Sequence, residues 1–191
     1  MSQPLEDFRP ASKNQAGATL IELILTVALI GILSSVAIVS FLRYTRKSKA
    51  AEAPINIKAI ATGALAWYSA DHSDQQGRPL PKHFPNAKSP WEVRADKNNE
   101  PWARVCGLFK KNVTTWHRAP WTQLRFSIAK AHWYHYHFDQ SGVNENATYT
   151  IEANSDLDCD GVLSTYKTVG IVHKKSGEIL RSQLLVVNGL E

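Results

Sequence analysis

The sequence predicts an α+β fold, in which one long N-terminal α-helix packs on a C-terminal antiparallel β-sheet. An apolar run over 18–42 is long enough for a membrane-spanning half of that helix, and residues 43–70 continue it with the periodicity of an amphipathic half. The last third of the chain is rich in β-branched and aromatic residues between turn signals, which is typical of strands. The head, over 71–191, is therefore expected to combine a loop-rich part over 71–122 with a sheet over 123–191.

The apolar run extends from Ala18 to Leu42 and contains one charged residue, Glu22. As a helix it measures roughly 37 Å, at about 1.5 Å per residue, which is enough to cross a bilayer. Because it is apolar on every face, it indicates a membrane segment, and a buried core helix is the alternative. The mean hydropathy of the whole chain is −0.28, which excludes a protein made mostly of such segments.

A polar segment over 1–17 precedes the run and has no net charge. A secretory signal peptide has its small residues after the apolar stretch, whereas Ala16-Gly17-Ala18 lies before it. If 1–17 is a leader that is processed, the cut must therefore fall on the N-terminal side of the run, so that the apolar helix stays on the mature protein. A cut after Gly17 would place the new amine of Ala18 about one helical turn from the Glu22 carboxylate, where the two charges can neutralise each other. An incidental charge at the membrane surface is the alternative for Glu22.

The run begins with Gly17-Ala18-Thr19-Leu20-Ile21-Glu22-Leu23 and continues with Ile30-Gly31-Ile32-Leu33-Ser34. These residues closely resemble the prepilin peptidase site and the N-terminal helix of type IV pilins and type II secretion pseudopilins. The resemblance implies that prepilin peptidase cuts between Gly17 and Ala18 and that the Ala18 amine is methylated. It also implies that Glu22 meets the amine of a neighbouring subunit during assembly. Ala18 is a departure, since the family usually has Phe or Met at this position.

The amphipathic half of the helix has apolar residues at steps of three and four, which predict one buried face. These residues are Ile57, Ile60, Ala61, Ala64, Leu65 and Tyr68. Pro54 lies within this half and is expected to remove a backbone hydrogen bond and disturb the helix. The helix is expected to stop near Asp71–Asp74, ahead of Gly77 and Pro79.

The loop-rich part of the head is basic and contains four tryptophans, Trp91, Trp102, Trp116 and Trp121. They could form an exposed adhesive surface, but we favour indoles that fill a small core beneath long loops. The basic residues give no firm nucleic-acid signal, because a phosphate-binding face needs clustering that one sequence does not display.

The last part of the head predicts three or four antiparallel strands packed on the C-terminal half of the helix. The expected strands are Leu124–Phe138, Ala147–Ala153, Tyr166–His173 and Glu178–Val187. They are separated by Asp139-Gln140-Ser141-Gly142, Asp160-Gly161 and Lys174-Lys175-Ser176-Gly177. The pilin resemblance implies the same α+β arrangement.

Two groups of residues in the head are candidate metal ligands. His135 and His137 share one strand face and could hold zinc, but no third ligand follows at metal-site spacing, so ordinary strand histidines are favoured. Asp156, Asp158 and Asp160 alternate before a glycine, which matches the first half of a calcium loop. The bidentate glutamate of such a loop is replaced by a lysine, so an acidic turn in solvent is the favoured alternative.

Cys106 and Cys159 are the only cysteines, and both lie outside the membrane segment. In an oxidising compartment they are expected to pair, closing a loop that stabilises the head by roughly 4 kcal/mol in the chain-entropy model. The resemblance supports this pairing, since many pilins close a C-terminal loop with one disulfide. Two free thiols are the alternative.

These features favour a structural subunit of a type IV pilus or a related pseudopilus, and no catalytic motif favours an enzyme. The resemblance implies prepilin peptidase, other pilin subunits and an inner-membrane assembly platform as partners. It places the precursor in the inner membrane, with a cytoplasmic leader and a periplasmic head, and the mature subunit in a filament. The basic residues after the apolar run favour the opposite orientation, but the cleavage motif is more specific. The alternatives are an uncleaved single-span envelope protein with a ligand-binding head and, less favoured, a zinc hydrolase.

Overall fold

The computed structural model describes residues 17–86 and 116–190. It divides into two compact units, of which the first ends at Phe41 and the second begins at Leu42. The first unit is the apolar part of the N-terminal helix. The second, called the head unit below, contains the rest of the helix and the sheet, and its core lies between them.

The N-terminal helix consists of two consecutive segments, α1 over Leu20–Ala50 and α2 over Glu52–Ser69. They are separated only by Ala51, whose own dihedral angles remain helical. The interruption lies where Pro54, which has no N–H group, fails to donate to the carbonyl of Ala50. The predicted long helix is therefore confirmed, with the predicted disturbance by proline at the junction of its segments.

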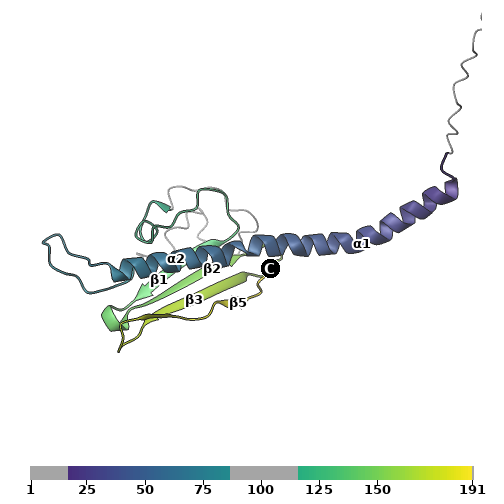
Figure 1. Cartoon of the computed structure of the whole chain (residues 1–191). Coiled ribbons are helices and arrows are strands. Elements are labelled where there is room, and N and C mark those ends of the chain that lie inside the picture. The colour runs from purple at the N-terminus through teal and green to yellow at the C-terminus, as the bar shows by residue number, and fades with distance from the viewer. Residues whose placement is uncertain (1–16, 87–115, 191) are drawn as a thin grey trace, which may run out of the picture. The chain divides into compact units, whose positions relative to one another are not determined.

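The sheet is antiparallel and follows the order β1-β2-β3-β4, while β5 pairs with β3 beyond the end of β4. The strands are β1 His135–Ser141, β2 Thr148–Ser155, β3 Ser164–Val172, β4 Ile179–Arg181 and β5 Leu185–Val187. Figure 1 shows α2 lying along the sheet, and α2 contacts β2 and β3. This arrangement confirms the predicted α+β fold.

Two predicted strand boundaries are wrong, each for a local reason. The first strand begins at His135 rather than Leu124, because Leu124 and Phe126 donate their N–H groups back to Pro120 and Trp121 in a folded turn. That strand also runs on through Ser141, so the predicted turn at Asp139 is displaced to a short 3-10 helix, η2, over Asn144–Asn146.

The last predicted strand is divided at Ser182. The Ser182 hydroxyl accepts the N–H of Val169 at 2.9 Å, taking the place of a main-chain carbonyl in the ladder. The N–H of Ser182 still donates to the carbonyl of Val169 at 2.8 Å. One side chain thus separates β4 from β5 while both stay paired with β3.

The core of the head unit forms where the buried face of α2 meets the inner face of the sheet. Every residue of the predicted apolar helix face is buried except Leu65, which is 38% exposed at the edge of the stripe. Trp116 and Trp121 are also buried, so these two indoles lie in the core rather than on an exposed surface, as predicted. Trp91 and Trp102 lie outside the described residues.

Two glycines allow close contacts within this core. A Cβ atom on Gly63 would lie 2.1 Å from the carbonyl oxygen of Leu124, so α2 approaches the 120–126 turn at backbone distance. A Cβ atom on Gly170 would lie 2.1 Å from the ring of Tyr149, its partner across β2 and β3. Glycine therefore determines both the helix–loop distance and the position of one aromatic ring.

Candidate assembly helix and its attachment to the head

The first unit presents an apolar helical surface that no described residue covers. Every large apolar side chain from Leu20 to Phe41 is between 52% and 76% exposed. The helix that contains them is long and apolar enough to cross a membrane. Such a surface is unfavourable in water, so it requires lipid or other apolar chains around it.

The start of this helix has a side-chain cap. The hydroxyl of Thr19 accepts the N–H of Glu22 at 3.3 Å, which is half of a capping box of the Thr-x-x-Glu type. Glu22 also lies in the first turn, where the helix dipole favours a negative charge. Sequence reasoning assigned Glu22 to assembly, at a position that the helix dipole favours, but it missed the cap by Thr19, although the Thr-x-x-Glu spacing is visible in the sequence.

In the head unit, Glu52 joins the helix to the beginning of β1. One carboxylate oxygen accepts the N–H of Trp133 at 2.9 Å, and the other accepts the N–H of Tyr134 at 3.3 Å and the hydroxyl of Tyr136 at 2.9 Å. Asn56, one turn further along α2, donates to the same hydroxyl at 2.7 Å. One carboxylate therefore satisfies three donors that lie about eighty residues away in the chain.

The tyrosines in this cluster are held in their protonated form. Burial, with the Glu52 carboxylate as a further cause, raises the pKa of Tyr136. Burial also raises the pKa of Tyr134, whose hydroxyl lies 3.1 Å from that of Ser164. Both hydroxyls thus remain neutral, and that of Tyr136 can donate to the Glu52 carboxylate.

Two more contacts attach the end of α1 to the head. Arg46 forms an ion pair with Asp158, with 2.7 Å between the guanidinium nitrogen and the carboxylate oxygen. The ammonium of Lys49 lies 3.9 Å from the ring centroid of Trp133, which is a cation–π distance. The end of α1 is therefore fixed to the head by two basic side chains, and the start of α2 by one acidic side chain.

The predicted calcium residues converge in one turn. Asp156, Asp158 and Asp160 each offer an oxygen within 4.8 Å of the others, and they are the only such group of three or more acidic, His or Cys residues within 17–86 and 116–190. Their carboxylates already accept hydrogen bonds or form an ion pair within the protein. Asp156 accepts the N–H groups of Cys159 and Gly161, Asp160 accepts that of Val162, and Asp158 pairs with Arg46. The geometry fits an acidic turn stabilised by the protein, and calcium binding stays a prediction.

The other predicted site residues fall into separate places. Tyr136 and Phe138 are buried while His135 and His137 are half-buried, which is the expected strand alternation. Cys159 lies in the acidic turn with a positive φ of 70° and is not a free thiol. Cys106 lies outside the described residues, so the disulfide between the two stays a prediction.

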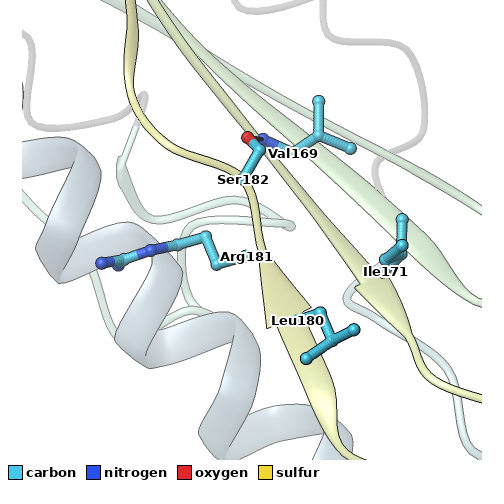
Figure 2. Close-up of a pocket in the computed structure, with 5 residues that line it drawn as sticks. All are labelled: Val169, Ile171, Leu180, Arg181 and Ser182. Carbon is cyan, nitrogen blue, oxygen red and sulfur yellow. Dashed lines mark hydrogen bonds between the residues drawn. The ribbon is translucent and has the colours of Figure 1, made fainter.

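A small apolar pocket lies on the outer face of the sheet, near β4. It is lined by Val169, Ile171, Leu180, Arg181 and Ser182. Figure 2 shows Ile171 and Leu180 on one side of the strands and Arg181 pointing to the other. The pocket has no convergent polar groups, so it has no features of a catalytic site.

Comparisons with known proteins agree with this geometry. Residues 12–38 match the family described as the prokaryotic N-terminal methylation motif. The chain is also 42% identical over 62 residues to the type IV major pilin protein PilA of Myxococcus xanthus. That match covers 32% of this chain and 27% of the relative, so it spans about a quarter of the relative's length. No solved structure matches.

The fold and the matched motif define a class of protein that carries a methylation motif on an apolar helix in front of an α+β head. Within that class, the chain is similar to type IV pilins, through the methylation motif and a distant likeness to one major pilin. Type IV pilins, to which the chain is similar, are structural proteins rather than enzymes. The methylation motif and the apolar helix together are consistent with a membrane precursor.

Proposed function

We propose that this protein is a structural subunit of a type IV pilus or a related pseudopilus. The single observation that carries the proposal is the exposed apolar helix that begins at the methylation motif. Burying one large apolar side chain completely contributes about 1.5–3 kcal/mol. Exposing a helix lined with such side chains to water is therefore strongly unfavourable. The helix can leave lipid only for a bundle of similar helices.

The proposed processing leaves the helix start intact. A cut after Gly17 leaves Ala18 as the only residue before the capping Thr19, so the new amine lies next to the helix N-terminus. A methylated amine there would face the Glu22 carboxylate of a neighbouring subunit and neutralise a charge that lipid does not solvate. The precursor would lie in the inner membrane, with the leader in the cytoplasm and the head in the periplasm.

Mass spectrometry and N-terminal sequencing of the protein recovered from cells test the processing. The expected mature chain begins at Ala18 and carries one methyl group on its amine. A chain that begins at Met1 would support the alternative, an uncleaved single-span protein with a ligand-binding head. A chain that begins beyond Leu42 would mean that the apolar helix is a discarded signal.

Two substitutions separate the charge of Glu22 from its role at the helix start. Glu22→Gln keeps a polar side chain suited to the capping position but removes the charge, whereas Glu22→Ala removes both. We expect both variants to enter the membrane and to fail in filament assembly, as seen by electron microscopy of sheared filaments. Glu152→Gln, on the outer face of the sheet, is the control and should assemble. Normal assembly of Glu22→Gln would reject the charge-pairing role while leaving the pilin assignment in place.

We also propose that Cys106 and Cys159 pair in the periplasm. The bond would tie the loop-rich part of the head to the acidic turn next to Arg46. Peptide mapping of the unreduced protein should recover the two cysteines in one linked peptide pair. Recovery of both as alkylated thiols would refute the bond.

A further inference from the structure

A pair of histidines lies where α2 passes into the following loop of the head. His72 and His83 are both half-buried, and their ring centroids are 5.4 Å apart with an angle of 53° between the planes. The ring of His72 stacks on the indole of Trp67 at 4.2 Å, and His83 approaches the same indole edge-on at 6.3 Å. The two histidines are eleven positions apart in the chain, so only the fold reveals the pair.

The tautomer of each ring follows from its hydrogen bond. Nε2 of His72 lies 2.9 Å from the carbonyl oxygen of Trp67, and Nδ1 of His83 lies 2.8 Å from that of Pro81. A carbonyl oxygen can only accept, so each of these nitrogens carries the proton. In the neutral rings, Nδ1 of His72 and Nε2 of His83 therefore hold the free lone pairs. A carbonyl partner that fixes the tautomer is the usual environment of a metal-binding histidine.

The ring separation also suits one shared metal ion. With a metal–nitrogen distance of about 2.0–2.1 Å and a ring centroid about 1.1 Å behind the nitrogen, two tetrahedral ligands place their centroids roughly 5.2 Å apart. The observed separation is 5.4 Å. The separation of the ring centroids is therefore compatible with both imidazoles binding the same ion.

The loop that carries the pair is held in shape by its own hydrogen bonds. Leu80 donates to the carbonyl of His72 at 2.7 Å, and Ser73 pairs with Pro79 in an antiparallel bridge. Beyond the bridge, the Asp74 carboxylate accepts two main-chain N–H groups and the Arg78 side chain. Such a loop holds His83 beside His72 in the absence of a ligand, which lowers the entropy lost on binding.

We propose that His72 and His83 form a two-imidazole site for a divalent transition-metal ion such as Zn²⁺, Ni²⁺ or Cu²⁺. Imidazole nitrogen suits these ions, whereas Ca²⁺ and Mg²⁺ prefer oxygen. Water, or a ligand from another molecule, fills the remaining coordination positions. The site is independent of the Asp156, Asp158 and Asp160 turn, which offers only carboxylates.

Isothermal titration of the untagged full chain in detergent with ZnCl₂ tests the site. We expect one Zn²⁺ ion per chain, and at least a tenfold loss of affinity in both His72→Gln and His83→Gln. His173→Gln is the matched control, because the ring of that exposed histidine hydrogen-bonds with Ser176 in a different turn, so this substitution should leave binding unchanged. Absence of Zn²⁺ binding by the wild-type chain, or unchanged binding in either loop variant, would overturn the proposal.

A second measurement uses the wild-type chain, so it does not depend on whether the two histidine variants fold. Electron paramagnetic resonance of the wild-type chain with one equivalent of Cu²⁺ should display coupling to two imidazole nitrogens. Coupling to one nitrogen or to none would reject a two-imidazole site. Asp158→Asn should leave the spectrum unchanged, whereas a changed spectrum would assign the ion to the acidic turn and overturn the proposal.

Discussion

Removing the Glu52 carboxylate should destabilise the head more than removing any exposed acidic side chain. In Glu52→Ala, the N–H groups of Trp133 and Tyr134 and the hydroxyl of Tyr136 lose their acceptor. A hydrogen bond to a charged group contributes about 1.5–3 kcal/mol, and an unsatisfied buried donor costs about 1–3 kcal/mol. Because the three bonds share one carboxylate, their contributions do not add fully, and we expect a total loss of about 3–5 kcal/mol.

Urea unfolding of the full chain in mild detergent, followed by tryptophan fluorescence, measures this loss. Glu52→Gln keeps one acceptor oxygen and should lose about 1–2 kcal/mol. Glu152→Ala is the matched control, since its pair with Lys167 is half-exposed and should contribute less than about 1 kcal/mol. Hydrogen exchange at the Trp133 and Tyr134 amides should accelerate in Glu52→Ala alone. If Glu52→Ala unfolds at the same urea concentration as Glu152→Ala, the proposed attachment is wrong.

Three further predictions concern the core of the head unit. Gly63→Ala should destabilise the head by about 1–3 kcal/mol, because its Cβ would collide with the Leu124 carbonyl, and an unchanged urea midpoint would contradict that contact. Gly170→Ala should displace the Tyr149 ring and lower the thermal midpoint, and a crystal structure with an unmoved ring would refute this. Burial lowers the pKa of His132 below 6.5, so the unfolded chain binds the proton more readily and stability falls as the pH drops below about 6.5. His132→Phe should remove this part of the pH dependence, and urea midpoints from pH 7.5 to 5 measure it.

The sequence predicted well what depends on local periodicity. The apolar face of α2 was visible because its residues recur at helical spacing, and the alternation of Tyr136 and Phe138 with His135 and His137 was visible as strand spacing. The methylation motif was visible for the same reason, since all of its residues lie in one short segment. Local patterns were therefore sufficient for the fold class and for the similarity to type IV pilins.

The attachment of the helix to the head could not be predicted in this way. Glu52 lies off the apolar stripe of α2, and its partners begin at Trp133, so neither spacing nor composition connects them. The histidine pair is similar, because His72 and His83 are joined by a hairpin whose shape depends on Asp74. The division of the last strand at Ser182 depends on one hydroxyl that replaces a main-chain acceptor, and serine in a strand gives no such signal.

The junction at Ala51 has a mechanical consequence. Pro54 gives no N–H to the Ala50 carbonyl, so the helix lacks one axial hydrogen bond at this point. The contacts of Arg46 and Glu52 with the head lie on either side of it. A tensile force applied along the helix would therefore pass into the head before it reached the weakened turn. Several modest contacts would share that force in shear, and the subunit would resist stretching at the place where its helix alone is weakest.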